Sequence, residues 1–428
     1  MAKPKLALIP AAQGTKLYSV LPSDGTGDFD FTRGSVATRI NAQGLIENVA
    51  SGQSRLNYPL IDGVQKGCPH HILEPARTNV IQYSESFSNS YWVKATVSLS
   101  SNQIISPNGA LDADKITESS TNGLQQIYSD VITTTPSSDY VYSIFIKKGE
   151  RSWVKVMTAN NSGANFNVEN GIIGIVDSGV NAEIEDYGNG WFKCSVSFNT
   201  SVSADRVYVR ISTSNGVTSY QGDGSSGLYI FGAMLEQGSF PTSYIPTNGE
   251  SGGVTRSAET ANGAGNSTTF NDSEGVLMAE ISALSDEAGY KLLSINNNTV
   301  NNQITIGISS ALNNLYVDSK IGNSAVISNG ALPAIQQNFN KILVKYKSGS
   351  NSIYLNGFKI DSNSNTFTPT GNQLIELEFS YYTSTLQFYG NVKQLQYFDS
   401  ALADIQLEQL TSWQSFRDMA NGQLYTIE

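Results

Sequence analysis

The chain alternates apolar and polar residues in many short segments, most clearly between residues 81 and 247. Successive side chains of a strand face opposite sides, so this alternation predicts β-strands that each cover a core with one face. Examples are YVYSIFIKKG, WFKCSVSF, RVYVRISTS and LYIFGAMLEQ, with Gly, Asn, Asp and Ser between them. Many short strands at this spacing are typical of a β-sandwich or jelly roll. YGNGW (Tyr187–Trp191) predicts a hairpin turn, because Asn-Gly tolerates positive φ angles.

A second series of predicted strands lies between residues 269 and 400 and includes KYKSGSNSIYLNG, which has the pattern of a hairpin. The period then changes to that of a helix over residues 401–416. We expect one short helix there, with Asp399 or Ser400 as its N-cap. The apolar side chains with this spacing are Leu402, Ile405, Leu407, Leu410 and Trp413.

Two stretches lack strong patterning. Residues 1–80 contain short extended pieces broken by Pro and Gly, with too little apolar content to stand alone, so we expect them to pack on a neighbouring domain, another subunit or a larger assembly. Residues 248–268 are rich in Gly, Ser, Asn and Thr and suit an exposed connector. The predicted fold is therefore all-β, with two tandem β-sandwich (jelly-roll) domains at 81–247 and 269–428, a small N-terminal unit at 1–80 and a linker at 248–268.

Composition and charge exclude some functions. The net charge of −11 repels phosphate backbones, which argues against a nucleic-acid partner. No apolar run reaches the roughly 18 residues of a membrane span, so no membrane insertion is expected. MAKPKLALIPAAQG is too brief for a secretory signal, which favours synthesis in a cytoplasm. Cys68 and Cys194 are the only cysteines and are expected to be free thiols.

The motif LEPARTNVIQYSE (Leu73–Glu85) opens the central region, and GAMLEQGSFPTSYIPT (Gly232–Thr247) closes it. Together with YSIFIKKGE, YGNGWFKCSV and the pair Thr255–Arg256, these segments resemble, in order, a module of bacteriophage tail, fibre and receptor-binding proteins. The FTRGSVATRINAQGLIE segment resembles the part upstream of that module. The resemblance implies a virion protein whose central module is similar to carbohydrate-binding sandwiches.

Residues 269–416 resemble concanavalin A-like, laminin G-type lectin domains. The resemblance lies in the hairpin NSIYLNGFKID (Asn351–Asp361) and in GNVKQLQYFDSALADIQLEQL (Gly390–Leu410), where Asp399-Ser400-Ala401-Leu402 precedes the helix. It implies a fold more firmly than a ligand, because this superfamily includes lectins, glycanases and structural spacers.

Sugar binding needs aromatic rings beside planar polar groups. Trp153 lies between Arg151 and Lys155, and Tyr381 and Tyr382 lie at a predicted loop tip among Ser and Thr. We take these three residues as the candidate glycan-binding residues. The alternative for each is packing on a neighbouring loop or subunit. Trp92 and Trp191 are expected in the core.

Catalytic and metal chemistry has weaker candidates, and we predict no catalytic residue. His70 and His71 are adjacent in a Pro-flanked loop, which suits a surface or packing role better than a metal clamp. Glu376 and Glu378 share one strand face and could form the carboxylate pair of a glycanase, or simply a solvated face. No cofactor is expected. The laminin G resemblance leaves calcium open, with Asp318, Asp361 and Asp399 as possible ligands; Asp24–Asp28 is too short for an EF-hand.

The sequence therefore predicts a phage virion protein, made in the host cytoplasm, that forms part of a tail or fibre and is not an enzyme. The N-terminal unit would contact other virion proteins, and the sandwiches would bind host-surface glycan weakly and multivalently as a homotrimer or other homo-oligomer. A capsid decoration or head-fibre protein with an assembly role is the alternative. A glycan-degrading tail enzyme is a third possibility.

Overall fold

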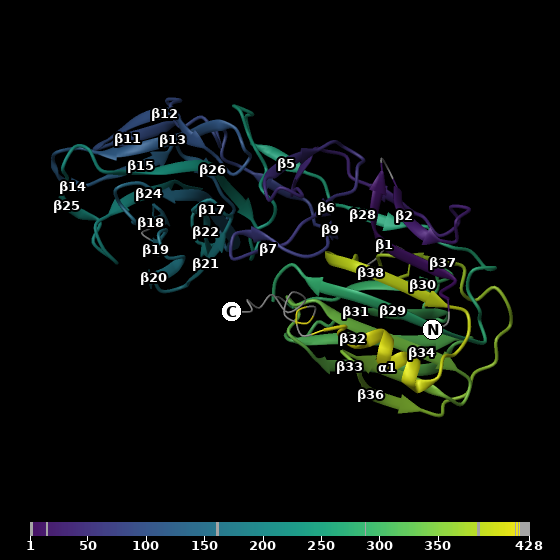
Figure 1. Cartoon of the computed structure of the whole chain (residues 1–428). Coiled ribbons are helices and arrows are strands. Elements are labelled where there is room, and N and C mark those ends of the chain that lie inside the picture. The colour runs from purple at the N-terminus through teal and green to yellow at the C-terminus, as the bar shows by residue number, and fades with distance from the viewer. Residues whose placement is uncertain are drawn as a thin grey trace.

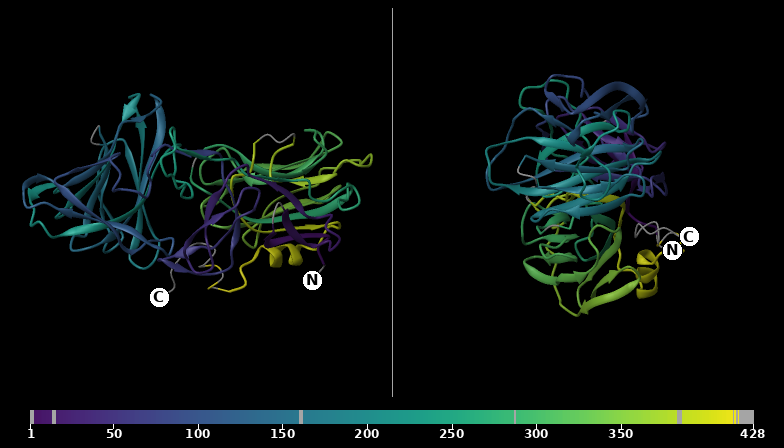
Figure 2. Two further views of the ribbon diagram at one scale, coloured as in Figure 1. Left: turned by 90° about the horizontal axis from the view of Figure 1, so that it is seen from above. Right: turned by 90° about the vertical axis from the view of Figure 1, so that its left-hand side faces the viewer.

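The computed structural model describes residues 3–13, 16–159, 162–286, 288–382 and 386–415, together with Arg417 and Met419. Strands dominate these residues, and α1 (Asp404–Thr411) is the one helix assigned a span among them. Two β-sandwiches lie side by side and make the molecule elongated (Figures 1 and 2). The all-β prediction with two tandem sandwiches and one short helix is confirmed. Within the described part of the chain, no helix is long and apolar enough to span a membrane.

The central sandwich packs two six-stranded antiparallel sheets around one core. The first sheet has the order β11 (Trp92–Ala95), β15 (Gln126–Ser129), β24 (Val207–Ser212), β18 (Trp153–Thr158), β19 (Gly163–Asn167) and β20 (Ile172–Val176). The second has the order β12 (Val97–Ile105), β13 (Leu111–Glu118), β26 (Gly227–Gln237), β17 (Ser138–Lys148), β22 (Trp191–Thr200) and β21 (Val180–Asp186). Trp92 and Cys194 lie in this core, and Trp191 is buried in a second cluster, on the outer side of the second sheet. Both cysteines are free thiols, as predicted, and Cys68 is exposed.

The predicted Asn-Gly turn at Tyr187–Trp191 is confirmed, and a second Asn-Gly turn follows at Asn356–Gly357. Asn189 and Gly190 have φ angles of 53° and 76° between β21 and β22, where the Trp191 amide donates to the Gly188 carbonyl oxygen at 2.9 Å. Asn356 and Gly357 turn β35 (Asn351–Leu355) into β36 (Phe358–Asn363) with φ angles of 49° and 94°. The positive φ angles explain why these turns carry Asn and Gly.

The C-terminal sandwich packs a five-stranded sheet against an eleven-stranded sheet. The smaller sheet has the order β33 (Ser324–Pro333), β32 (Asn314–Ile321), β31 (Gln303–Ile308), β30 (Lys291–Asn296) and β37 (Glu376–Glu378). The larger sheet includes β29 (Glu274–Ala283), β34 (Asn340–Lys347), β35, β36 and β38 (Gly390–Phe398). Its other members come from the N-terminal part of the chain and from residues 260–262.

The N-terminal strands complete the large sheet of the C-terminal sandwich (Figure 1). β1 (Leu6–Gln13) pairs with β38, and so does β9 (His70–Leu73). The hairpin of β4 (Ala37–Ile40) and β5 (Ile46–Val49) reaches the other sandwich, where Ile46 packs with Phe145, Trp191 and Phe231. The prediction that this unit packs on a neighbouring domain is confirmed, and the unit contacts both sandwiches.

Residues 248–268 are not the exposed connector that their composition suggested. β27 (Val254–Arg256) pairs with β10 (Arg77–Asn79), and β28 (Thr260–Asn262) pairs with β3 (Phe29–Thr32). Arg256 and Glu259 are buried. Their charges are compensated there, because both belong to a network of oppositely charged groups. The division of the chain into four ranges stays a prediction.

That network, which we call the junction cluster, consists of Arg33, Arg55, Glu74, Arg256 and Glu259. Arg33 Nη1 lies 2.7 Å from Glu259 Oε1, and Arg55 Nη2 lies 2.8 Å from Glu74 Oε2 and also contacts Glu259. Arg256 Nη1 lies 3.0 Å from Glu74 Oε2. The cluster therefore joins the opening LEP motif to the closing Thr255–Arg256 pair. Asn79 strengthens this seam, since its Nδ2 donates to the Ile245 carbonyl oxygen at 2.8 Å.

The helix begins later than expected. Residues 401–403 are extended, and Ala403 is the N-cap with φ −70° and ψ 149°. The Ala403 amide donates to Gln406 Oε1 at 3.2 Å. The predicted cap at Asp399 or Ser400 is wrong, because Asn271 Nδ2 donates to the Asp399 carbonyl oxygen at 2.8 Å and that segment stays beside β29. The helix packs its Leu407 on Met278 and Leu343, outside the large sheet.

Candidate functional site

Trp153 lies on the outer face of the first sheet of the central sandwich. Val154 and Val156 of β18 point into the core, so Trp153 and Lys155 point outward. The pairing register places Arg210 of β24 beside Lys155, and Gln126 of β15 beside Arg210. Tyr128 and Tyr208 pair in the next row. We call the group Gln126, Tyr128, Trp153, Lys155, Arg206, Tyr208 and Arg210 the tyrosine–arginine face.

Aromatic and cationic groups alternate on this face. The rings of Tyr128 and Tyr208 stack with centroids 4.9 Å apart and planes 28° apart. The Arg206 guanidinium lies 5.5 Å from the Tyr128 ring centroid, and that of Arg210 lies 5.4 Å from the Tyr208 centroid. Such cation–π contacts are worth roughly 0.5–1 kcal/mol at exposed sites, so they hold the four side chains in order.

The charges of this face are only partly compensated. Lys155 Nζ lies 2.8 Å from Asp177 Oδ2, and Arg206 Nη2 lies 3.8 Å from Asp130 Oδ1. Arg210 Nε donates to the neutral Gln126 Oε1 at 2.6 Å, and no carboxylate of the described residues forms an ion pair with Arg210. Burial lowers the pKa of Arg210. The face thus offers phenol, amide and guanidinium groups on a rigid sheet.

Trp153 occupies one end of the face and is half-buried. Its ring lies close over Gly174 of β20, where a Cβ would come 2.6 Å from the Trp153 ring. A larger residue at position 174 would push the ring away. The predicted candidate residue is therefore held in place beside planar polar groups, which the sequence could not show.

Tyr381 and Tyr382 lie on the outer side of the small sheet of the C-terminal sandwich, and both are half-buried. Their ring centroids are 4.5 Å apart. Gln303 Nε2 donates to the Tyr381 hydroxyl at 2.8 Å and to Asp318 Oδ2 at 2.9 Å. The buried Gln303 Oε1 has no hydrogen-bond partner among the described residues. The Tyr381 ring thus lies beside buried polar groups, and this second face offers phenol, amide and carboxylate groups in place of the guanidinium groups of the first.

Glu376 and Glu378 lie on β37 with their side chains on that same side of the sheet. Asn298 Nδ2 donates to Glu376 Oε1 at 3.0 Å, and Asn296 Nδ2 donates to Glu378 Oε1 at 2.6 Å. Burial, and the charge of Glu376 to a smaller extent, raise the pKa of Glu378. The shared face of the two carboxylates is as predicted, and their use as a catalytic pair stays a hypothesis.

The two histidines do not lie in a loop as expected; they form part of β9 and are buried. His71 Nδ1 lies 3.2 Å from Ser54 Oγ, and His70 Nε2 lies 3.3 Å from Asn57 Nδ2. Burial lowers the pKa of His70 to about 3, with repulsion by Lys393, and lowers that of His71 to about 4. Both histidines therefore remain neutral packing groups at neutral pH.

The structure does not bring the calcium candidates together. Asp318 accepts from Gln303, whereas Asp361 Oδ2 accepts from Asn329 Nδ2 at 3.0 Å on another strand. Asp24 and Asp28 close turns by accepting from the amides of Thr26 and Ser19. Across the ranges that the structure describes, no group of three or more His, Cys, Asp or Glu side chains is arranged to hold a metal ion.

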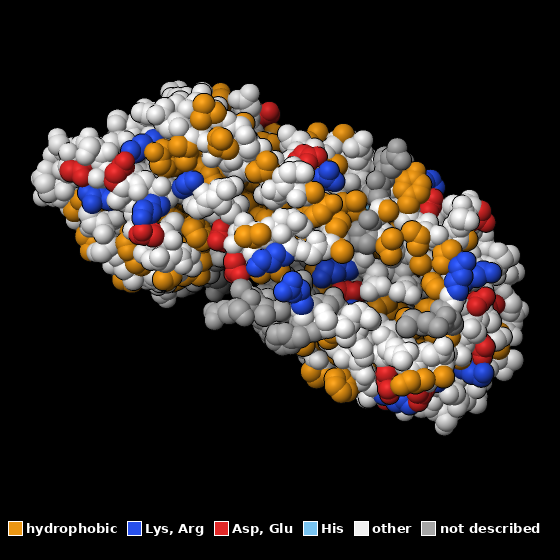
Figure 3. Space-filling view, in the orientation of Figure 1, with side chains coloured by type: hydrophobic (Ala, Val, Ile, Leu, Met, Phe, Trp, Pro, Cys, Tyr) orange, Lys and Arg blue, Asp and Glu red, His pale blue; other side chains and the backbone are white. Residues whose placement is uncertain are grey.

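A hollow of about 460 Å³ lies where the N-terminal strands and both sandwiches meet. Glu183, Glu185 and Lys193 enter it from the central sandwich, and Lys193 Nζ lies 3.3 Å from Glu185 Oε2. Burial and repulsion by Glu185 raise the pKa of Glu183 to about 7. In Figure 3, Lys and Arg side chains gather at the narrow part between the two sandwiches, with Asp or Glu side chains beside them. Charges at this junction are thus largely paired within the protein.

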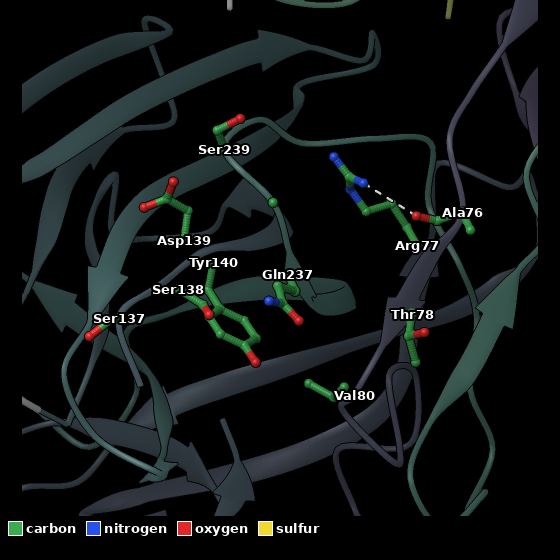
Figure 4. A pocket seen from close by; sticks show the side chains of 11 residues that line it. Ala76, Arg77, Thr78, Val80, Ser137, Ser138, Asp139, Tyr140, Gln237 and Ser239 are labelled. Carbon is green, nitrogen blue, oxygen red and sulfur yellow. Dashed lines mark hydrogen bonds between the residues drawn. The ribbon is translucent and has the colours of Figure 1, made fainter. Parts of the chain in front are cut away.

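A second hollow, which we call the Arg77 pocket, measures about 780 Å³ and lies at one end of the central sandwich. Arg77 of β10 lies on one side of it, Ser137, Ser138 and Asp139 lie on the other, and Gln237 lies between them (Figure 4). Arg77 belongs to the LEPARTN motif, but its pocket was missed by sequence reasoning. The motif gave no sign that the start of β17 and the end of β26 would face it.

Comparisons with known proteins give similarity over parts of the chain. No protein-family model and no curated protein sequence matches it. Similar solved structures include the CBM40 module of a Ruminococcus gnavus IT-sialidase bound to α2,3-sialyllactose, with a TM-score of 0.30, 18% identity, and coverage of 35% of this chain and 88% of that one. A SAP-like pentraxin from Limulus polyphemus has a TM-score of 0.27, 13% identity, and coverage of 34% and 72%. Domains LG4-5 of the mouse laminin α1 chain have a TM-score of 0.23, 11% identity, and coverage of 67% and 92%.

Proposed function

We propose that this protein binds glycan non-covalently through the outer faces of its sandwiches. The observation that supports this proposal is the tyrosine–arginine face, where phenol, indole, amide and guanidinium groups lie side by side on one rigid sheet. Sugars present hydroxyl groups and apolar C–H faces at once, and such mixed surfaces complement both. Because these side chains already contact one another, little of their freedom is lost when a ligand binds.

We further propose that the binding is multivalent and belongs to a phage tail or fibre protein. The phage assignment depends on the sequence motifs, from Leu73–Glu85 to Thr255–Arg256. Two faces per chain, at Trp153 and at Tyr381, would act together in a homo-oligomer. Linking weak sites raises avidity by roughly 10²–10⁴-fold without any tight individual site.

Binding of the purified chain to an array of bacterial surface glycans tests the proposal, with and without Trp153→Ala and Arg210→Gln. Each substitution is expected to weaken binding of the recognised glycan at least tenfold. Trp413→Ala is the matched control, because Trp413 is also half-buried but contacts Lys341, outside both faces. If the Trp153 and Trp413 variants bind alike, the tyrosine–arginine face is not the site.

Glycan cleavage is a second candidate function, favoured only by the raised pKa of Glu378 beside Glu376. We propose that these residues are structural and that bound glycan is released intact. Incubation with a recognised polysaccharide is expected to produce no new reducing ends. Release of reducing ends by the native chain, with loss of that release in Glu378→Gln, would establish an enzyme instead.

A further inference from the structure

We propose that the Arg77 pocket is a second binding site and that it takes an acidic saccharide, with the sugar carboxylate against the Arg77 guanidinium. The pocket involves none of the residues of the tyrosine–arginine face. This second site therefore goes beyond the function proposed above, and each site can be tested without the other.

Arg77 has unused hydrogen-bonding capacity. A guanidinium carries five N–H donors. Among the described residues, the only hydrogen-bond acceptor of Arg77 is the Ala76 carbonyl oxygen, 3.2 Å from Nη1. The buried Nε has no hydrogen-bond partner, and the nearest carboxylate oxygen, Glu236 Oε2, lies 3.7 Å from it. A ligand carboxylate in the pocket would accept from the terminal nitrogens of the guanidinium, since the buried Nε is out of its reach.

The positive charge of Arg77 is also incompletely compensated. Glu236 is fully buried and accepts hydrogen bonds from the Thr242 amide at 2.8 Å and from Thr242 Oγ1 at 2.6 Å. The charges of Arg256 and Lys193 act on the same carboxylate. Arg256 and Lys193 have Glu74 and Glu185 as further partners, at 3.0 and 3.3 Å. Arg77 has only the 3.7 Å approach of Glu236 among the described residues. A negative ligand would give Arg77 a closer partner.

Local packing fixes the position of the guanidinium. It lies over the ring of Phe240, with Cζ 5.2 Å from the ring centroid. On another side it lies against Gly238, where a Cβ would come 2.7 Å from Nε and Nη2. Gly238 has a φ of 150°, so the chain there has no side chain to compete with Arg77 for this space. The arginine is thus held at the wall of the pocket before any ligand arrives.

The remaining lining suits a polyhydroxylated ligand. It offers the hydroxyls of Thr78, Ser137 and Ser138, the Gln237 amide and the Asp139 carboxylate (Figure 4). Val80 and Tyr140 are the only large apolar side chains in it. Because most of the lining is hydroxyl, amide and carboxylate groups, it favours a sugar acid over a peptide with apolar side chains. The volume lies within the range of about 300–1,000 Å³ that is typical of ligand sites.

Calorimetric titration with a trimer of galacturonic acid tests the proposal, with its methyl ester as the uncharged counterpart. The native chain is expected to bind the acid at least tenfold more tightly than the ester, and the difference should shrink as salt is added. Arg77→Gln is expected to remove the preference for the acid and leave the ester affinity unchanged. Asp139→Ala is expected to weaken the ester, because it removes a contact to hydroxyls, and to weaken the acid less, because it also removes a negative charge from the pocket.

Lys148→Gln is the matched control, because it removes the same charge from an exposed ion pair with Glu169 at the far end of β17. It should bind both trimers as the native chain does. Arg77→Lys keeps a cation beside Glu236 and covers the case in which Arg77→Gln fails to fold; it is expected to lose several-fold in acid affinity. Equal affinity of the native chain for acid and ester would overturn the proposal. A tetrapeptide with a free carboxylate that binds as tightly as the acid trimer would overturn the saccharide assignment.

Discussion

Glu74 shows most clearly how single residues hold this protein together. It is buried, accepts hydrogen bonds from the Ser243 amide at 2.8 Å and Ser243 Oγ at 2.6 Å, and pairs with Arg55 and Arg256. The charges of Arg256 and Arg55 outweigh the effect of burial and lower its pKa. Arg256 therefore depends on Glu74 for its ion pair, and Arg55 shares its compensation between Glu74 and Glu259.

Replacing Glu74 with Gln keeps the shape of the side chain and removes the charge. Breaking a buried ion pair from one side costs about 3–5 kcal/mol, because the remaining charges stay buried and uncompensated. We expect a loss of that size in the free energy of unfolding, measured by urea denaturation. Glu47→Gln is the control: Glu47 pairs with Arg39 at 3.0 Å on the surface, and such pairs are worth about 0–1 kcal/mol. Equal losses in both variants would contradict the role of the junction cluster.

The lowered pKa values of the buried His70 and His71 predict that the free energy of unfolding depends on pH. Their pKa values in the folded chain, about 3 and about 4, lie below the ordinary histidine value of 6.5. As the pH falls below about 6.5, the unfolded chain binds protons first, so stability is lost on acidification and is unaffected above that pH. At pH 5 the loss amounts to roughly 2 kcal/mol for each histidine, at 1.36 kcal/mol per pH unit.

His71→Gln should therefore lose less stability than the native chain between pH 8 and pH 5, by about 2 kcal/mol. Denaturant midpoints at the two pH values measure this difference. An identical loss in native chain and variant would mean that His71 is already protonated or exposed in the folded state.

At the residue scale, the sequence can predict which side chains of a strand are buried, because this depends largely on the alternation within that strand. Trp191 was expected in the core and is buried, but on the outer side of its sheet, where Ile46 of the N-terminal unit packs on it. Tyr128 and Tyr208 were not singled out from the sequence, although their neighbours Ile127, Val207 and Val209 are core residues of the same strands. Their stacking depends on the pairing of β15 with β24, about 80 residues apart in sequence. A single sequence contains no record of that register, so the tyrosine–arginine face could not be assembled in advance.

At the scale of elements, β1 is the test of whether the N-terminal strands belong to the C-terminal sandwich. Leu6 and Leu8 of β1 are buried in the core of that sandwich, beside residues of β29 and β38. Ile9 on the same strand is 45% exposed. The sequence predicted an attachment unit from the low apolar content of residues 1–80. The few apolar side chains it has suffice because a sheet already exists for them to extend.

Leu8→Ala and Ile9→Ala form a matched pair on that strand. A buried Leu→Ala substitution costs about 2–5 kcal/mol, whereas surface changes usually stay within about 0.5 kcal/mol. We expect Leu8→Ala to lower the thermal stability of the C-terminal sandwich and Ile9→Ala to leave it nearly unchanged. Unfolding monitored by near-ultraviolet circular dichroism checks this expectation. If the C-terminal sandwich tolerates both substitutions, β1 is only loosely attached.

At the scale of the whole molecule, composition gave a wrong prediction for residues 248–268. Residues 248–268 look like a linker because they are small and polar, yet β27 and β28 join the opening motif and the N-terminal strands. Two charged residues, Arg256 and Glu259, take the place of an apolar core in this segment. Composition counts apolar residues, and it cannot show that buried charges have partners of opposite sign elsewhere in the chain.

Limited digestion with trypsin distinguishes a linker from this junction, because Arg256 is the only Lys or Arg among residues 248–268. Its side chain is fully buried, and its Nη2 donates to the Pro75 carbonyl oxygen at 2.9 Å. A protease must draw several residues into an extended conformation, which requires local unfolding of β27. We expect no fragment ending at Arg256 while the chain is folded, with rapid cleavage there in urea as the control.

Glu74→Gln should increase cleavage at Arg256, since it removes the partner that keeps the arginine buried. Early cleavage of the native chain at Arg256, measured by mass spectrometry, would mean that the two sandwiches are joined by a flexible segment and that the junction cluster does not hold them together.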